Sequence, residues 1–300
     1  MKKIIYSAGM IVFVAALAIG ATGAFFSDTE TSTGNTFTAG DIDLKIDNES
    51  YAIDFNIPDF QNPTGVLVSN PGNSWELADL VAGTHKFFNF EDVKPGDYGE
   101  DTISIHVGSN DAWMCAAAHL TDDSDQSCTE PELADDPSCV APGLGQGELD
   151  SIINFAFWAD DGDNVYEPGG DNRETIFLQG PLSALDDAGQ LALATPSGGA
   201  FGNQPVPGNE TVYIGKIWCA GTLTPTNLVQ DGLGVSISPL GGTGFICDGT
   251  SIDNAAQTDR VRGDMQFYAV QSRNNPNFSC SSYTPVWPET PITGPNDVTA

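Results

Sequence analysis

The sequence predicts an all-β protein, built as a sandwich of short antiparallel strands with long decorated loops. Apolar residues recur at every second position in several short segments, which is the period of a half-buried strand. The 33 Gly and 19 Pro residues divide the 300-residue chain into short pieces. Almost no segment has the period of an amphipathic helix. Together these features favour a sandwich or barrel over a helical fold.

The composition allows a substantial core and argues against two classes of partner. The chain has 10 basic and 41 acidic side chains, which gives a formal charge of −31. Such a surface repels nucleic acid and anionic membranes, so neither is expected as a partner. It suits divalent cations, a salty habitat or simple solubility at a cell surface. Because 40% of the residues are apolar, including 5 Trp and 16 Phe, disorder is not expected.

The first 24 residues predict an export signal. A basic start precedes an apolar run from Ile4 to Gly20, and small residues follow up to Ala24. This order is typical of a signal peptide that signal peptidase cuts between Ala24 and Phe25, so a secreted, cell-surface or extracellular protein is expected. The alternative is an uncleaved anchor, because the run from Ile4 to Phe26 is just long enough to span a bilayer.

The first segments after the signal predict a β-hairpin. Ile42–Ile46 and Tyr51–Ile57 each place apolar side chains at every second position, and the polar residues Asp47–Ser50 between them predict a turn. Residues 58–73 contain several Pro and Gly residues and predict a loop. His85–Phe90 is expected to form a short strand.

The middle of the chain predicts further strands. Lys94–Asp97 has the Pro-Gly-Asp order of a turn, and Ile103–Val107 then supplies an inward-facing row. Ala112–Leu120 is apolar on both faces, as in a covered strand. Residues 121–137 contain seven acids and no base, so an exposed insertion is expected. Ile152–Trp158 predicts the next strand.

The last third of the chain repeats this pattern. We expect short strands at Arg173–Gln179 and Thr211–Cys219, and a helical turn within Leu182–Leu193. Asp264–Gln271 alternates again and predicts a strand with one apolar face. After Cys280 the chain becomes polar and rich in Pro, which is typical of a tail.

Six cysteines, an even number, predict disulfide bonds in an exported protein. Cys128 and Cys139 enclose the acidic insertion and are expected to pair with each other. The other four lie in or beside predicted strands, and the sequence leaves three pairings open among them: Cys115, Cys219, Cys247 and Cys280.

Two blocks resemble a known family. GAFFSDTETSTGNTFTAGDIDLKIDN, at Gly23–Asn48, is similar to the processed N-terminus of TasA/camelysin-type secreted proteins, which carry SipW-type signal peptides. FEDVKPGD, at Phe90–Asp97, with the strand TISIHV behind it, resembles the turn and strand that follow in that family. The resemblance implies a jelly roll and a structural subunit of biofilm-matrix fibres or pili. It also implies subunits that donate their N-terminal strands to one another.

The residues after the predicted cut suit such a donated strand. Phe25 and Phe26 would begin a free, largely polar arm, and burying each ring is worth about 2 kcal/mol. An open sheet edge on a neighbouring copy would pair with the arm and give a head-to-tail filament, a homopolymer. The alternative is that both rings fold back onto their own domain.

The predicted organisation is a signal peptide at 1–24, a donor arm at 25–40, a sandwich domain at 41–280 and a tail at 281–300.

An acidic segment, DDGDNVYE, partly matches a calcium-binding loop. In that register Asp161, Asp163 and Glu167 would supply carboxylates to Ca²⁺, which prefers oxygen ligands. Two ligand positions are filled by Ala and Gly, so Asp160 or Asp171 would have to substitute. The alternative is a solvated acidic turn.

No sequence motif predicts catalysis. The chain has no H-E-x-x-H, no G-x-S-x-G and no Walker-type loop, and its three histidines, His85, His106 and His119, lie in strand-like segments. We therefore expect a non-enzymatic protein. The alternatives are a secreted metallopeptidase, which the name camelysin implies, and a monomeric, calcium-stabilised surface-binding module.

Overall fold

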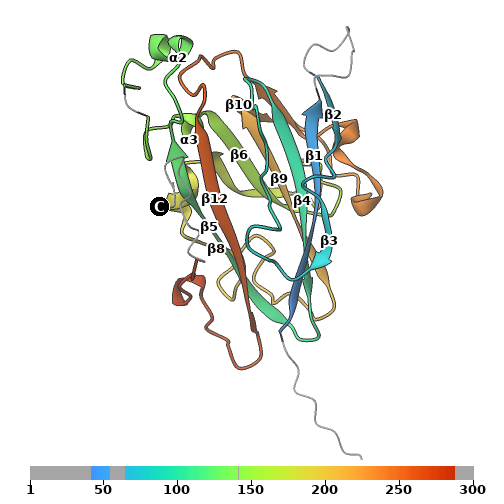
Figure 1. Ribbon diagram of the computed structural model, residues 1–300. Coiled ribbons are helices and arrows are strands. Elements are labelled where there is room, and N and C mark those ends of the chain that lie inside the picture. The colour runs from blue at the N-terminus through green and yellow to red at the C-terminus, as the bar shows by residue number, and fades with distance from the viewer. Residues whose placement is uncertain (1–41, 55–64, 141, 288–300) are drawn as a thin grey trace, which may run out of the picture. The chain divides into compact units, whose positions relative to one another are not determined.

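The computed structural model describes residues 42–54, 65–140 and 142–287 and shows two antiparallel sheets packed face to face (Figure 1). The strands of the larger sheet lie in the order β2 (Val66–Ser69), β1 (Leu44–Asp54), β4 (Tyr98–Val107), β9 (Thr211–Ala220), β6 (Ile153–Asp160) and β7 (Thr175–Pro181), and β3 (Trp75–Ala78) also pairs with β1. The smaller sheet has the order β12 (Arg260–Gln271), β5 (Ala112–Ser124) and β8 (Gln190–Ala194).

The remaining elements are short and lie in the connections. β10 (Thr222–Pro225) and β11 (Phe245–Asp248) form a separate two-stranded ribbon. The short helices are α2 (Glu130–Asp135), α3 (Leu149–Ile152) and α4 (Ala184–Ala188), and the 3₁₀ turns are η1 (Gly234–Ser236), η2 (Pro239–Gly241) and η3 (Cys280–Ser282).

The predicted all-β sandwich with decorated loops is confirmed. The chain crosses from the larger sheet to the smaller between β4 and β5, returns to β6, crosses again from β7 to β8 and returns to β9. These repeated crossings between two antiparallel sheets give the sandwich jelly-roll-like connectivity.

The main core lies between the two sheets. Ile103 and Ile105 of β4 are fully buried, as the alternating pattern predicted. They share one apolar cluster with Phe155 of β6 and Ala116 of β5. Phe267 of β12 packs against this cluster but is only half-buried. Burial of these inward rows holds the two sheets together.

The predicted hairpin at the start of the domain is wrong. β1 is one continuous strand that runs through Asp47–Ser50 and pairs with β4 along its length. Asn48 and Ser50 looked like turn residues because they are polar, but both are buried. The Asn48 amide nitrogen donates to the carbonyl oxygen of Asn73 at 2.8 Å, so its polarity is satisfied inside the protein.

Three further predictions needed correction. His85–Phe90 forms no strand, because its aromatic side chains cover the core from a loop, with Phe87 buried against Trp75. Residues 58–73 are not all loop, because β2 lies within them. β3, β8, β10 and β11 were not predicted.

The acidic insertion at 121–137 is not uniformly exposed either. Its first residues extend β5, where Asp122 is buried and paired with Arg260. Glu132 is also buried, since its carboxylate accepts a hydrogen bond from the Thr129 backbone at the start of α2. Acids that accept such bonds can be buried despite their charge.

All six cysteines pair within the chain. Cys128–Cys139 forms as predicted, and the structure resolves the open choice as Cys115–Cys280 and Cys219–Cys247. Three disulfides fit a protein that folds in an oxidising compartment. Among the residues that the structure describes, no helix is long and apolar enough to cross a membrane.

The two ends of the chain differ in what the structure describes. The predicted signal peptide at 1–24, the cut between Ala24 and Phe25, and the arm at 25–40 with Phe26 lie outside the described residues. The first part of the predicted tail, residues 281–287, packs on the smaller sheet, where the Tyr283 ring stacks on Tyr268 at 3.9 Å.

Candidate functional site

The predicted calcium loop lies where β6 ends. Trp158 and Asp160 of β6 are on the face of the larger sheet away from the main core, because Phe155 and Phe157 occupy the alternate positions. Val235, in the segment between β10 and β11, approaches this loop so closely that a Cβ at Gly162 would lie 2.6 Å from its side chain. The loop is therefore covered rather than exposed.

Asp160 fixes the shape of this loop. Its Oδ1 accepts a hydrogen bond from the Trp158 indole at 2.8 Å. Its Oδ2 accepts from the backbone of Gly162 and Asn164 at 2.9 and 3.1 Å. Gly162 and Asn164 both have positive φ, at 112° and 60°, a conformation that Gly and Asn adopt most readily. These residues turn the chain sharply and bring the next carboxylates together.

Two groups of carboxylates share Asp163. In the first, oxygens of Asp163, Glu167 and Asp231 lie within 4.8 Å of one another, and in the second those of Asp160, Asp163 and Glu174 do. We call these five residues the acidic centre.

The structure thus brings two of the three predicted ligands together. Asp163 and Glu167 meet, the suggested substitute Asp160 joins them, and Asp161 belongs to neither group. The sequence pattern did not reveal Glu174 or Asp231, because both lie outside the eight-residue motif.

The acidic centre has no basic partners among the described residues. In the described part of the chain, none of its five carboxylates forms an ion pair with Lys, Arg or His. Burial raises the pKa of Asp163 to about 7 and that of Asp160 to about 6. Burial, followed by the charge of Asp160, raises the pKa of Glu174 to about 9. All three of these acids still accept hydrogen bonds from the backbone. Asp163 accepts from Val165 at 2.8 Å, and Glu174 accepts from Asp161 and Glu167 at 3.1 and 2.8 Å.

Glu100 adds a further carboxyl beneath the centre. It is fully buried on β4, and neither of its oxygens has a hydrogen-bond partner among the described residues. Burial raises its pKa well above the ordinary value, and the charges of Asp160, Asp101 and Asp163 raise it further. So many buried carboxyls without bases favour either bound protons or a hard cation such as Ca²⁺.

A second feature is the outer edge of β12. This strand of 12 residues has β5 as its only strand partner in the described part of the chain, and Figure 1 shows it at the border of the smaller sheet. Met265, Phe267 and Ala269 point toward the core but are only half-buried. A long edge strand with unpaired backbone groups is a template for strand addition.

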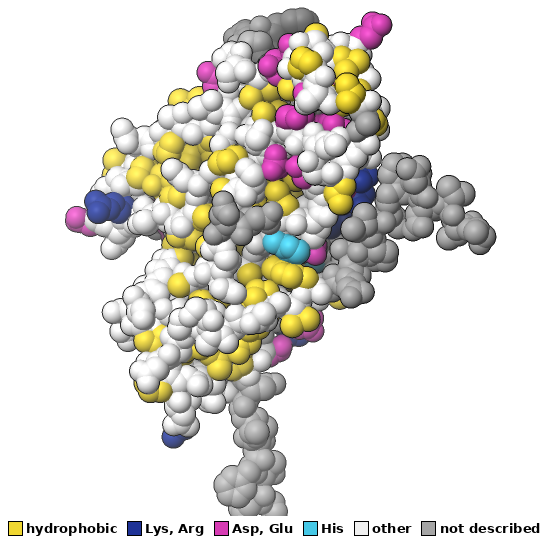
Figure 2. Space-filling view, turned by 90° about the vertical axis from the view of Figure 1, so that its left-hand side faces the viewer, with side chains coloured by type: hydrophobic (Ala, Val, Ile, Leu, Met, Phe, Trp, Pro, Cys, Tyr) yellow, Lys and Arg dark blue, Asp and Glu magenta, His cyan; other side chains and the backbone are white. Residues whose placement is uncertain are grey.

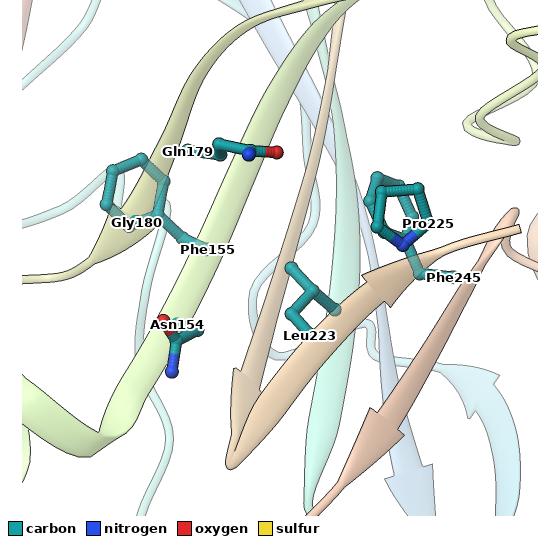
Figure 3. Close-up of a pocket in the computed structure, with 7 residues that line it drawn as sticks. All are labelled: Asn154, Phe155, Gln179, Gly180, Leu223, Pro225 and Phe245. Atoms are coloured by element: carbon teal, nitrogen blue, oxygen red, sulfur yellow. The ribbon is translucent and has the colours of Figure 1, made fainter.

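A pocket of about 130 Å³ opens between β6, β7 and the β10–β11 ribbon (Figure 3). Its lining offers two amides but no acid, base or nucleophile: Asn154, Phe155, Gln179, Gly180, Leu223, Pro225 and Phe245.

Each of the three histidines contacts a different residue, and none contacts another histidine in the interactions below. His106 bonds Asp47 at 2.7 Å, His119 stacks on Trp287, and His85 stacks on Trp75. No group of three potential metal ligands in the described residues includes a histidine.

No protein-family model matches this chain, and no curated protein matches it.

Proposed function

We propose that this protein is a non-enzymatic, secreted structural subunit that assembles into extracellular fibres or pili. In this proposal the N-terminal arm, residues 25–40, is donated to the β12 edge of a neighbouring copy. The observation that carries the proposal is that edge: a strand of 12 residues with one strand partner in the described part of the chain and half-buried apolar side chains. The resemblance of residues 23–48 to fibre-forming proteins supports the same function.

The chemistry of the arm and of the edge is complementary. Added backbone hydrogen bonds would give affinity, and burial of Phe25 and Phe26 would contribute about 2 kcal/mol per ring. β12 also begins with two of the chain's 10 basic residues. One of them, Arg262, has a side chain that is 47% exposed, whereas the arm carries Asp28 and Glu30. Both arginines also approach Asp122 of β5, so attraction between opposite charges would add little to backbone pairing at this edge.

Truncation of the arm tests the proposal. Mature protein that begins at Phe25 should form filaments in negative-stain images, whereas protein lacking residues 25–34 should fold and stay monomeric. A matched control keeps the arm's length but changes Phe25→Ser and Phe26→Ser, and it should polymerise poorly. Filaments formed by the truncated protein would overturn the proposal.

A second candidate function is a monomeric, calcium-stabilised surface-binding module, which the acidic centre favours. Ca²⁺ bound by Asp163, Glu167 and Asp231 would relieve the repulsion among their carboxylates and stabilise the native state by mass action. Saturating CaCl₂ should therefore raise the melting temperature of wild type and of the exposed control Asp171→Asn by more than that of Asp163→Asn. Superimposable wild-type curves with and without CaCl₂ would eliminate calcium at this centre. Size-exclusion chromatography of mature protein distinguishes the module from the polymer.

A further inference from the structure

A second group of carboxylates lies at the junction of three segments of the chain. Asp125 follows β5, Glu148 precedes α3, and Asp259 precedes β12. One oxygen from each lies within 4.8 Å of the other two. Acidic side chains gather in the upper part of Figure 2, on the side of the molecule where Figure 1 shows α2 and α3.

Each of these carboxylates has a buried oxygen without a donor. Asp125 is only 3% exposed. Its Oδ1, the Oε2 of Glu148 and the Oδ1 of Asp259 are all buried and accept no hydrogen bond from an N–H or hydroxyl group in the described part of the chain. The Oδ1 of Asp123 is in the same condition. The Asp125 and Asp259 carboxyls lie close enough to hydrogen-bond to each other, which requires a proton on one of them. Buried polar atoms are almost always satisfied, so four such oxygens on neighbouring segments call for a ligand.

The second oxygen of Asp259 shows how the group is positioned. Oδ2 accepts hydrogen bonds from the backbone of Glu148 at 2.6 Å and of Leu149 at 3.2 Å. These bonds fix the carboxylate against the start of α3 and leave Oδ1 as its atom without an N–H donor. The arrangement is therefore built by the fold rather than by a chance meeting of mobile surface acids.

No base neutralises this group. The nearest arginines in sequence, Arg260 and Arg262, both approach Asp122, at 2.6 and 3.8 Å. In the described residues no ion pair forms with Asp125, Glu148 or Asp259. Burial raises the pKa of Glu148 to about 7, and burial followed by the side-chain hydrogen bond with Asp125 raises the pKa of Asp259 to about 8.

We propose that Asp125, Glu148 and Asp259 bind a calcium ion, with Asp123 as a fourth carboxylate beside it. All of the proposed metal ligands are carboxylate oxygens, which hard cations prefer. Several carboxylates at one ion suit Ca²⁺ better than Mg²⁺, which usually keeps most of its water ligands. Zinc is disfavoured because the neighbouring sulfurs, Cys128 and Cys139, are joined in a disulfide and are not thiolates.

The proposed ion would join the ends of one long connection. Asp125 and Glu148 bracket the segment that contains α2 and the Cys128–Cys139 disulfide, and Asp259 anchors both to the beginning of β12. Bound calcium should therefore order residues 126–147, while the acidic centre on the other sheet would act independently.

Calcium binding to two single-site variants tests the proposal. Mature protein is freed of divalent ions, and equilibrium dialysis against CaCl₂ is done in the Asp163→Asn background, which removes the acidic centre. We expect one ion per chain there, and at least a tenfold weaker affinity after Asp125→Asn or Glu148→Gln. Glu130→Gln, an exposed acid of α2 in the same connection and outside the group, is the matched control and should leave binding unchanged.

Melting temperature and protease cleavage, each measured with and without calcium, test whether the ion binds at this group and orders the connection. Without calcium, Asp125→Asn should melt no lower than its parent, because it removes one of several repelling charges, yet it should lose the response to CaCl₂. Calcium should slow cleavage within residues 126–147 in the parent but not in the variants, and NaCl of equal ionic strength should not. Unchanged calcium binding in both variants, or none in the Asp163→Asn parent, would overturn the proposal.

Discussion

Lys216 and Asp101 form an ion pair in the interior, where the loop after β3 meets the larger sheet. The Lys216 Nζ lies 2.7 Å from Asp101 Oδ2, and both side chains are fully buried. The ammonium also donates to the carbonyl oxygen of Phe87. Asp101 Oδ1 in turn accepts from Asn48 at 3.1 Å and Asn73 at 3.3 Å. This network attaches an irregular loop to the sheet.

Removing one partner of this pair should be strongly destabilising. Burial lowers the pKa of Lys216 while Asp101 opposes that shift, so Asp101→Asn would leave an uncompensated buried amine. We expect a loss of about 3–5 kcal/mol in the free energy of unfolding, measured in urea. The double variant Asp101→Leu with Lys216→Met should lose much less, because apolar residues can replace a buried pair. Equal losses in the two variants would contradict this account.

Glu100 should make the fold less stable as the pH rises. Its folded pKa is well above its ordinary value, so the folded state binds the proton more tightly than the unfolded chain. The resulting stability is fully present below about pH 4 and is lost as the pH rises through the folded pKa. Glu100→Gln in EDTA should therefore gain more in melting temperature at pH 8 than at pH 5. The exposed control Glu76→Gln should show no such difference, and parallel wild-type and Glu100→Gln profiles would refute the assignment.

At the scale of elements, the sequence predicted strands where apolar residues alternate or form a short continuous run. β4, β5, β6, β9 and β12 were found on that basis, and their inward side chains lie in the core or pack against it. β1 was divided in two because the buried polar residues Asn48 and Ser50 imitate a turn. Their hydrogen bonds reach segments distant in sequence, which periodicity does not report.

Contacts between segments distant in sequence also limited the prediction of the carboxylate groups. Asp163 and Glu167 are four residues apart and could be found from local spacing, and the structure places them together. Asp231 joins them from a segment beyond β10, and the Asp125, Glu148 and Asp259 group joins three separate segments. Such sites depend on tertiary contacts and could not be found without the fold.

The disulfides should differ in their contribution to stability. Cys115–Cys280 closes a loop with a sequence separation of 165, and Cys128–Cys139 one of 11. Chain entropy predicts about 5 kcal/mol for the longer loop and about 3 kcal/mol for the shorter one. Urea unfolding of the paired Cys115→Ala/Cys280→Ala and Cys128→Ala/Cys139→Ala variants should show this order. The reverse order would mean that native-state contacts, rather than loop closure, dominate.

At the scale of the whole molecule, charge and sheet edges would govern association between copies in the proposed fibre. With a formal charge of −31, copies of this protein repel one another at long range, and salt screens that repulsion over about 10 Å at 0.1 M. Assembly therefore needs a short-range attraction. Backbone pairing at an edge strand, with burial of two aromatic rings, supplies one that charge does not abolish.

Hydrogen exchange of the β12 backbone tests the central claim most directly. Filaments of mature protein are compared with the monomer that lacks residues 25–34. Donation of the arm to this edge predicts slower exchange of amides within Arg260–Gln271 in the filament, while β7, one of the edge strands of the larger sheet, exchanges as in the monomer. Unchanged exchange in β12, or new protection confined to β7, would contradict the claim that β12 accepts the arm.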